Sequence, residues 1–426
     1  RFMAILPNLP VEIWRQILTL IIRIPGLLCV DKQDPFIQSV EFEPHAGQLS
    51  HRATLLLVCT DWHATVKQLI HEHIIITTEQ QLYSLITTLK APPDPRYRCT
   101  LGHYTRRIDL QLQNPSAKAN TVTAQILRRT PHLEIFINGN YHNNNISGSR
   151  VKQCSSEIIS TLSTLCAPSL RRVEWTCNDC PSWSDLMLLL RSLSELRSLT
   201  VANLYGTVFE RFRPERISLP QLRTLEVGNT PSFSHASLGN APLNALLTTL
   251  SLSPDQLPSL QRLEGFSPFS PDFLLAHGRK IRIVRTVAQT PLLPQIIAQC
   301  PNLDTFIAVF PYKLTVPLSH PTLRRIGIFP VAENSIGVPA QIFNSYVMTP
   351  LTELLQQIDR STLPKLAQVR IRNTGTLADV TNYPGSLQTW WRRWNIRGVR
   401  FEDKNGRPFQ DVESDEDALL DTLRGD

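Results

Sequence analysis

Two cysteines of this chain have the spacing of metal ligands. Cys177 and Cys180 are separated by two residues, as in many zinc sites, and Cys154 and Cys166 lie upstream. A site with four thiolates requires a second closely spaced pair, but the upstream cysteines are 12 residues apart. We therefore predict that these cysteines do not form a metal site.

Other catalytic patterns are missing from the sequence. The histidines of His71-Glu72-His73 lack the four-residue spacing that places two zinc ligands on one helix face. The sequence also has no glycine-rich phosphate loop, no nucleophile elbow and no defensible Ser, His and Asp triad. We expect no catalytic residue, no cofactor and no metal, and hence a non-catalytic protein.

A repeated sequence frame predicts the elements of the chain. Around Leu222, proline lies at −2, leucine at 0 and apolar residues at +3 and +5. Further copies begin at Leu133, Leu170, Leu196, Leu260, Leu303, Leu323 and Leu366, and a weaker one at Ile281. The residue at +3 is apolar in all eight stronger copies, namely Phe136, Val173, Leu199, Leu225, Leu263, Phe306, Ile326 and Val369.

The offsets of this frame are those of a short strand. Residues at +3 and +5 face one side of an extended strand, and the proline ends the element before it. Five of the eight gaps between copies lie within the roughly 20–29 residues of a leucine-rich repeat, and the three longer gaps predict insertions. The chain resembles an irregular leucine-rich repeat array, which implies an α/β solenoid with parallel strands and outer helices. Cys177, at +7 of its copy, is interpreted as a turn residue of the repeat.

Length and charge narrow the class of protein. A chain of 426 residues exceeds the roughly 250–300 at which single cores stop growing, so two modules or a repeat array are expected. The net charge is +7, and basic pairs such as Arg171-Arg172 and Arg324-Arg325 fall at +1 and +2 of the frame. We favour a solvated face over a groove for an anionic partner, and we do not favour nucleic acid as a partner.

The expected location follows from two observations. The eight cysteines show no evident pairing, which fits a reducing compartment and therefore a cytoplasmic or nuclear location. The longest apolar run, residues 17–30, is interrupted by Arg23, Pro25 and Gly26 and is too short for a bilayer of ~30 Å. We expect no membrane partner.

The N-terminal residues predict a small helical unit. Residues 9–18 begin a helix with proline at the first helical position, an acidic residue in the first turn and apolar residues at helical spacing, and this helix ends near Pro25. A second apolar segment covers residues 55–59. Thr60 or Asp61 caps a third helix, in which Trp62 and Val66 lie on one face.

This unit resembles an F-box, through Leu9-Pro10-Val11-Glu12-Ile13-Trp14 and the later Leu55-Leu56-Leu57-Val58-Cys59, followed by Trp62. In that family the module docks on the Skp-type adaptor of a cullin–RING ubiquitin ligase. The match covers residues 7–77, with an insertion at residues 25–50 that the family usually lacks. An F-box followed by leucine-rich repeats is similar to fungal members of the family. The resemblance implies adaptor contacts by Leu9, Pro10, Ile13, Trp14, Ile17, Leu18, Leu57, Val58 and Trp62.

The domain boundaries expected from these patterns are residues 1–77 for the F-box-like module, 78–105 for a linking helix and loop, 106–401 for the array with its C-terminal cap, and 402–426 for an acidic, mobile tail. The first strand of the array is expected at residues 108–112 and a surface loop at residues 228–242. Helices are expected at residues 79–89, 158–165, 186–193, 292–298 and 351–358. Near the C-terminus, Trp390 and Trp394 are four residues apart, and we favour a capping helix over a nucleic-acid surface.

The resemblance implies a substrate receptor of an SCF-type ligase, in which the array binds a target that the sequence does not identify. Two alternatives remain open. The first is a leucine-rich repeat scaffold without a ligase role. The second is a nucleic-acid-binding repeat protein that uses the arginine pairs and the tryptophans near the C-terminus.

Overall fold

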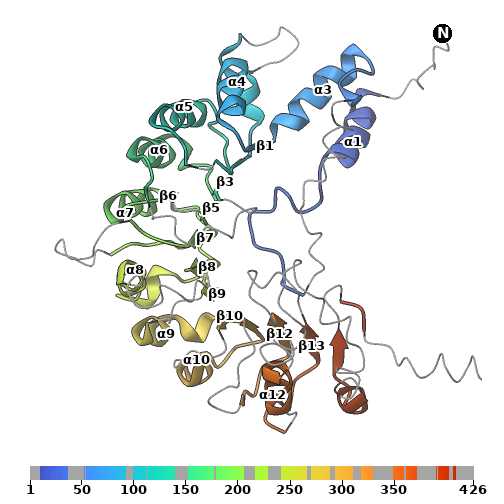
Figure 1. Cartoon of the computed structure of the whole chain (residues 1–426), viewed down its shortest axis with the longest axis vertical. Helices are drawn as coiled ribbons and strands as arrows, with labels where there is room; N and C mark the ends of the chain where they lie inside the picture. Colours follow the sequence, from blue (N-terminus) through green and yellow to red (C-terminus); the bar gives the residue numbers. More distant parts are fainter. Residues whose placement is uncertain are drawn as a thin grey trace, which may run out of the picture. The chain divides into compact units, whose positions relative to one another are not determined.

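The structure of the chain is a computed structural model (Figure 1). It describes residues 10–36, 52, 54–92, 99–112, 114–139, 152–176, 179–205, 216–228, 241–265, 270–287, 293–309, 318–329, 349–358, 361–371, 390, 392–402 and 406–408. The chain divides into two compact units. Unit 1 contains residues 1–33, 40–212 and 217–223, and unit 2 contains residues 34–39, 213–216 and 224–426.

Unit 1 begins with helices and continues with alternating strands and helices (Figure 1). The helices are α1 (Val11–Ile22), α3 (Thr60–His71), α4 (Glu79–Lys90), η1 (Leu101–Tyr104), α5 (Ala117–Leu127), α6 (Ser156–Thr161), η2 (Leu162–Cys166) and α7 (Trp183–Ser192). The strands are β1 (His73–Ile76), β2 (Arg107–Leu110), β3 (Ile135–Asn138), β4 (Lys152–Gln153), β5 (Arg172–Trp175), β6 (Asp179–Cys180) and β7 (Ser198–Val201).

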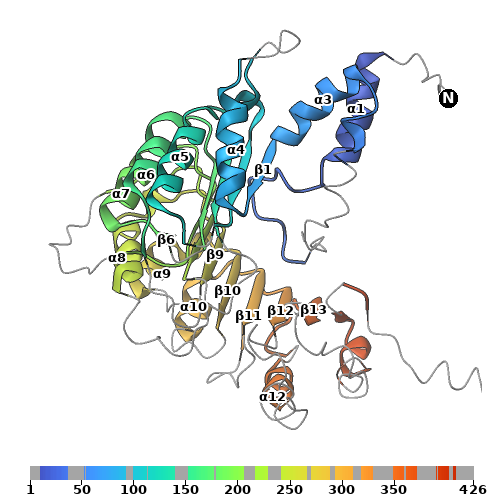
Figure 2. The same cartoon turned by 45° about the horizontal axis from the view of Figure 1, so that its top comes forward.

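The main strands of unit 1 are parallel and in register. They pair in the order β1, β2, β3, β5 and β7, and a separate parallel pair joins β4 and β6. Because parallel strands require a crossover, helices α4, α5, α6 and α7 come between successive strands from β1 to β7, and they lie next to one another on one side of the strands (Figure 2). This is a leucine-rich-repeat type of α/β architecture.

Unit 2 repeats the same arrangement. Its strands are β8 (Thr224–Val227), β9 (Arg262–Gly265), β10 (Ile283–Val287), β11 (Thr305–Val309), β12 (Arg325–Phe329), β13 (Gln368–Ile371) and β14 (Arg400–Glu402). Its helices are α8 (Ala241–Leu250), η3 (Pro254–Gln256), α9 (Pro271–His277), η4 (Gly278–Lys280), α10 (Leu293–Gln299) and α12 (Thr349–Gln357). Each strand is parallel to the next one in chain order.

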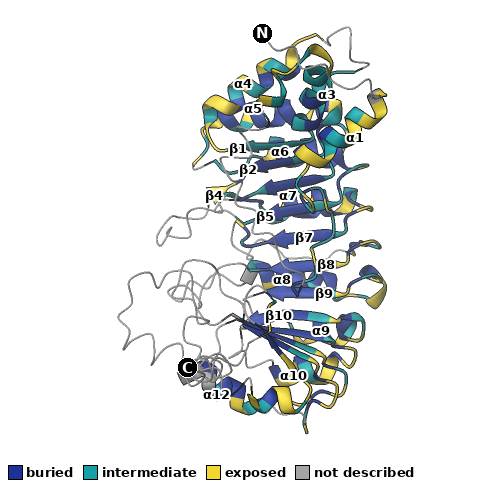
Figure 3. Cartoon of the chain, turned by 90° about the vertical axis from the view of Figure 1, so that its right-hand side faces the viewer, coloured by how far each residue is buried: buried dark blue, intermediate teal, exposed yellow. Residues whose placement is uncertain are grey.

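The repeat frame of the sequence defines the core of both units. In unit 1 the +3 residues Phe136, Val173 and Leu199 pair directly across neighbouring strands. In unit 2 the paired row is Leu225, Leu263, Val284, Phe306, Ile326, Val369 and Phe401. These side chains are buried, as are the leucines at position 0, so the strand interiors appear dark blue in Figure 3. The parallel strands implied by the resemblance to leucine-rich repeats are confirmed.

Several boundaries differ from the expectations. The array begins at β1 and α4, not at residue 106, because β1 pairs along its whole length with β2. The strand expected first, at 108–112, is therefore the second, and it ends at Leu110. At the other end β14 includes Glu402, which the sequence analysis placed in the tail. Of the expected loop at residues 228–242, only residues 228, 241 and 242 are described, and the last two begin α8.

The expected helices are present, and others were missed. Helices α4, α6 with η2, α7, α10 and α12 coincide with the five predicted segments to within a few residues. Helices α5, α8 and α9 were not predicted. The three long gaps between repeats each contain residues that lie outside the described part of the chain.

Candidate interaction surfaces

The N-terminal helices α1 and α3 pack against each other through a small apolar cluster. Its buried members are Leu18 and Ile22 of α1 and Val66 and Leu69 of α3, with partly buried residues such as Trp62 at its margin. The rings of Trp14 and Trp62 lie 5.1 Å apart between centroids, so each helix contributes one tryptophan to the same edge.

The ends of these helices differ by one position from the prediction. Pro10 is the residue before α1 and not its first residue, and its carbonyl accepts the backbone N–H groups of Ile13 and Trp14 at 3.0 and 3.2 Å. Cys59, and not Thr60 or Asp61, caps α3, because its Sγ accepts the N–H of Trp62 at 3.5 Å. A thiol is a weak acceptor, so sequence preferences favoured the neighbouring hydroxyl and carboxylate.

One face of α1 exposes apolar side chains. Ile13, Leu20 and Ile21 are 39, 82 and 57% exposed, and Ile17 is half-buried. These positions follow the i, i+4, i+7, i+8 spacing of a single helix face, opposite the buried Leu18. Leu20 and Ile21 were not among the predicted contacts, although the helical periodicity around Ile17 could have included them.

The other predicted adaptor residues fall into three groups. Leu57 and Val58, just before α3, are 85 and 46% exposed, and Pro10 is exposed as well. Trp14 and Trp62 are half-buried against each other. Leu18 is fully buried in the cluster between α1 and α3, where it holds the helices together and is inaccessible to a partner. Leu9 lies outside the described residues.

On several strands, the side chains that alternate with the buried row are charged. In unit 1, Arg107 forms two hydrogen bonds to Asp109, Nε to Oδ1 at 2.7 Å and Nη2 to Oδ2 at 2.8 Å, and His73 Nε2 lies 3.0 Å from Oδ2. On β5, Arg172 Nε donates to Glu174 at 2.7 Å. We call this side of each sheet its open face, because the core row points to the other side.

Burial and pairing set the protonation states on this face. Burial raises the pKa of Asp109, but the hydrogen bonds from His73 and Arg107 outweigh burial, so the pKa lies below its ordinary value. Burial lowers the pKa of His73, and the opposing effect of Asp109 is smaller. At neutral pH the pair therefore consists of a neutral imidazole and an ionised carboxylate that Arg107 neutralises.

Part of the expected insertion lies on the open face of unit 1. Arg107 Nη1 donates to the carbonyl of Leu27 at 2.6 Å, and Arg172 Nη1 donates to the carbonyl of Cys29 at 3.1 Å. Asp31 accepts a hydrogen bond from Arg223 Nη1 at 3.0 Å. The insertion was predicted only as a departure from the F-box pattern, and its contacts with the strands were not predicted.

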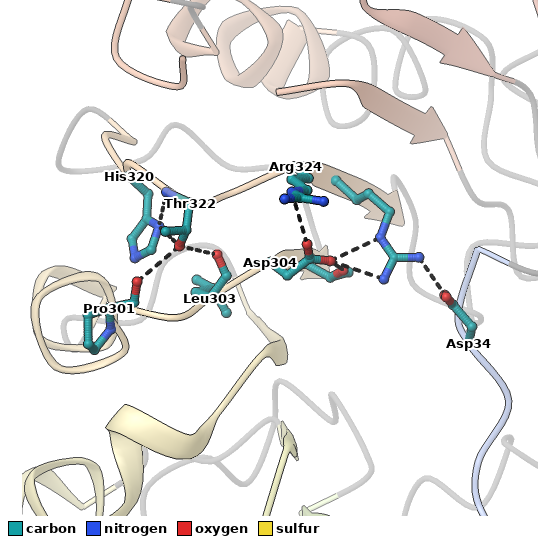
Figure 4. A network of polar contacts seen from close by, with 9 residues as sticks. Asp34, Pro301, Leu303, Asp304, His320, Thr322 and Arg324 are labelled. Carbon is teal, nitrogen blue, oxygen red and sulfur yellow. Dashed lines mark hydrogen bonds and ion pairs between the residues drawn. The ribbon is translucent and has the colours of Figure 1, made fainter. Parts of the chain in front are cut away.

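The continuation of the insertion contacts the open face of unit 2 (Figure 4). Arg325 forms ion pairs with two carboxylates, from Nη1 to Asp34 Oδ2 at 2.6 Å and from Nη2 to Asp304 Oδ2 at 3.2 Å. The other oxygen of Asp304, Oδ1, lies 3.7 Å from Arg324 Nε. The ring of Phe36 is buried, and the guanidinium carbons of Arg325 and Arg370 lie 5.2 and 5.3 Å from its centroid. Burial raises the pKa of Asp34, but Arg325 outweighs burial and lowers that pKa below its ordinary value.

The C-terminal strands of unit 2 contain a buried ion pair. Arg370 Nη2 lies 2.6 Å from Glu402 Oε2, and both side chains are almost completely buried. Next to them Trp390 and Trp394 are 8 and 2% exposed, and Trp394 packs on Phe401 with 5.5 Å between ring centroids. Buried rings are not accessible for base stacking, so this segment packs as the expected cap and not as a nucleic-acid surface.

The described cysteines are not clustered for metal binding. Cys154, Cys166, Cys180 and Cys300 are buried and free, and Cys177 lies outside the described residues. Within the described ranges no group of three or more His, Cys, Asp or Glu side chains is arranged to hold a metal ion. None of the helices in those ranges is long and apolar enough to cross a membrane.

The comparisons with known proteins found similarity among solved structures. No protein-family model and no curated protein matches this chain. Among solved structures, an internalin from Listeria monocytogenes aligns over 84% of this chain and 88% of its own, with 12% sequence identity and a TM-score of 0.33. The assignment of the repeat fold rests on the strand register described above.

Proposed function

We propose that this protein is the substrate receptor of an SCF-type cullin–RING ubiquitin ligase. In this proposal the α1 and α3 unit binds the Skp-type adaptor, and the repeat array binds a target protein. The receptor is non-catalytic, and it acts by holding target lysines near the ubiquitin-charged enzyme, which raises their effective concentration. The F-box resemblance supplies the ligase assignment, and the repeat architecture supplies the scaffold.

One observation supports this proposal above the others. Apolar residues that the resemblance assigns to the adaptor, Ile13, Leu57 and Val58, are exposed, although the same small unit buries Leu18 and Ile22 in its cluster. Isolated exposed apolar side chains are common on protein surfaces, but several on one short helix pair indicate an interaction site. Leu20 and Ile21 extend this surface along α1.

The test is co-purification of the whole chain with a Skp-type adaptor. Wild-type protein is expected to capture the adaptor, and Ile13→Asp and Leu57→Asp are expected to abolish capture because each places a charge in an apolar interface. Leu275→Asp is the matched control, since Leu275 is 70% exposed on α9 in unit 2. Failure of a folded wild-type chain to capture the adaptor would leave the alternative of a repeat scaffold without a ligase role.

A further inference from the structure

The residues directly before β2, β3, β5, β7 and β8 form a continuous row, and all five belong to unit 1. In this row each backbone N–H donates to the backbone carbonyl of the preceding member, at 2.7–2.8 Å: Glu134 to Arg106, Arg171 to Glu134, Arg197 to Arg171 and Arg223 to Arg197. Backbone pairing of this kind spaces neighbouring residues by about 4.8 Å. The row therefore places its side chains side by side at the start of the strands.

The charges of this row alternate at one end and not at the other. Arg106 is neutralised by Glu134, which accepts hydrogen bonds from Nε at 2.9 Å and from Nη2 at 2.8 Å. The next three positions are Arg171, Arg197 and Arg223, with no acidic residue between them. Three neighbouring guanidinium groups repel one another unless an anion lies between them.

Two of these arginines have no anionic partner among the described residues. Arg223 is paired with Asp31 at 3.0 Å, but the described part of the chain forms no ion pair to Arg171 or Arg197. The Nε atoms of Arg171 and Arg197 are also buried without a hydrogen-bond acceptor there. Buried donors are nearly always paired in folded proteins, so these two side chains have hydrogen-bonding capacity that the described residues do not use.

The chain itself shows which kind of ligand this row accepts. The carbonyl of Cys29 accepts a hydrogen bond from Arg172 of β5, and the carboxylate of Asp31 accepts one from Arg223 of the row. A peptide in extended conformation presents alternate side chains on one side about 6.7 Å apart, a spacing that long arginine side chains can match. The internal example is one carboxylate, that of Asp31 paired with Arg223, and the tryptophans that could have stacked bases, Trp390 and Trp394, are buried in unit 2.

We propose that Arg171 and Arg197, flanked by Arg223, bind an extended acidic peptide segment of a partner protein through charge-assisted hydrogen bonds. We assign this segment to the target protein of the ligase, and that assignment rests on the proposed function. The chemistry recognised is a pair of anionic side chains at alternate positions. The row is thus a specificity site of the array, distinct from the adaptor surface on α1 and α3.

The experiment measures binding of a fluorescein-labelled eight-residue peptide that carries glutamate at alternate positions and serine or glycine elsewhere. Binding to the full chain is followed by fluorescence anisotropy at low salt, with a glutamine-substituted peptide as the blank. The variant Arg171→Gln with Arg197→Gln is expected to weaken binding about 100-fold, roughly tenfold for each charged hydrogen-bonding group. The variant Arg279→Gln with Arg282→Gln removes the same charge from exposed positions of unit 2 and is expected to leave affinity unchanged.

Two further arms make the outcome decisive. The variant Arg171→Lys with Arg197→Lys retains the charge and is expected to restore part of the binding, which separates a folding defect from a lost contact. Replacement of the glutamates by phosphoserine tests the anion: tighter binding that is lost in the Gln double variant supports the site and identifies phosphate as its preferred group.

Equal affinity of the wild type and the Gln double variant overturns the inference. Stronger binding of a single-stranded oligonucleotide through the same arginines overturns it as well, in favour of a nucleic-acid site. Adaptor capture provides the distinction from the proposed function, because the Gln double variant is expected to capture adaptor normally. Peptide binding without adaptor capture would contradict only the ligase role. Adaptor capture without peptide binding would contradict only this inference.

Discussion

Phe36→Ala should release the described part of the insertion from the open face of unit 2. The Phe36 side chain is 7% exposed, and the guanidinium carbons of Arg325 and Arg370 lie 5.2 and 5.3 Å from its ring centroid. Burial of a phenylalanine contributes about 1.5–3 kcal/mol, and each cation–π contact adds about 0.5–1 kcal/mol. The substitution should therefore cost about 3 kcal/mol of local docking free energy, in line with the range of about 3–5 kcal/mol for buried Phe→Ala changes.

Limited trypsin digestion measures this local effect, because cleavage after Lys32 requires residues 29–36 to leave the surface. When opening is fast relative to cleavage, the cleavage rate follows the open population. A loss of about 3 kcal/mol corresponds to an increase of roughly 100-fold in that population. The remaining contacts of Asp31 and Asp34 limit the observed gain, so we expect between about 10-fold and 100-fold faster cleavage.

Cys29→Ser is the control for this experiment, because the Cys29 side chain is exposed and only its backbone carbonyl contacts Arg172. Its cleavage rate should equal that of the wild type. The thermal midpoint of Phe36→Ala should be close to that of the wild type, which separates local release from global unfolding. An unchanged rate after Lys32 in a folded Phe36→Ala variant would refute the docking of this segment.

Three other predictions follow from buried groups. Burial lowers the pKa values of His277 and His320 below the ordinary 6.5, and each ring accepts at Nδ1 while Nε2 donates to a carbonyl, at 2.7 Å for Leu250 and 3.0 Å for Cys300. Because the folded-state pKa values of both histidines are depressed, their contribution to the free energy of unfolding is complete above about pH 6.5 and is lost as the pH falls towards the folded-state values. The thermal midpoint should therefore drop between pH 7.5 and 5. The drop should be smaller in the double variant His277→Gln with His320→Gln. Gly278→Ala should lower the free energy of unfolding by roughly 1–3 kcal/mol in a denaturant titration, since the new Cβ would lie 2.3 Å from the Gln299 carbonyl oxygen, whereas Gly327→Ala, with its nearest atom at 3.4 Å, should cost less. Iodoacetamide at pH 8 should modify exposed Cys29 but not Cys166 or Cys300, because burial raises the pKa of both thiols to about 12; labelling of the buried pair in native protein, mapped by mass spectrometry, would contradict their placement.

The core of the array was predictable because it depends on local spacing. A leucine at position 0 and an apolar residue at +3 define where a strand begins and which side is buried, and the paired residues Leu225, Leu263, Phe306, Ile326 and Val369 follow that rule. Strand β1 was missed as a member of the array because no Pro-x-Leu frame precedes His73. Helix α5 was missed because Ala117–Leu127 is rich in alanine and threonine, which weakens the apolar periodicity.

The interaction surfaces were only partly predictable for a different reason. Helix α1 is apolar on most of its circumference, so its sequence could not distinguish the buried Leu18 from the exposed Leu20. The contact of Asp34 with Arg325 joins residues 291 positions apart, and no local pattern encodes such a pair. The row of Arg171, Arg197 and Arg223 became visible only when the backbone pairing placed the three residues side by side.

The position of the insertion constrains how a target can bind. On the open face of unit 1, Leu27 and Cys29 already use Arg107 and Arg172, and on that of unit 2, Asp34 and Phe36 already use Arg325. A target that approached these arginines would have to displace a segment held by several contacts, at a cost that subtracts from its own affinity. Arg171 and Arg197 form no hydrogen bond or ion pair with the described part of the insertion, so a ligand of these side chains does not have to displace it. Arg171 and Arg197 are therefore the residues of unit 1 best suited to an external acidic peptide, because the chain segment beside them pairs only with their neighbours.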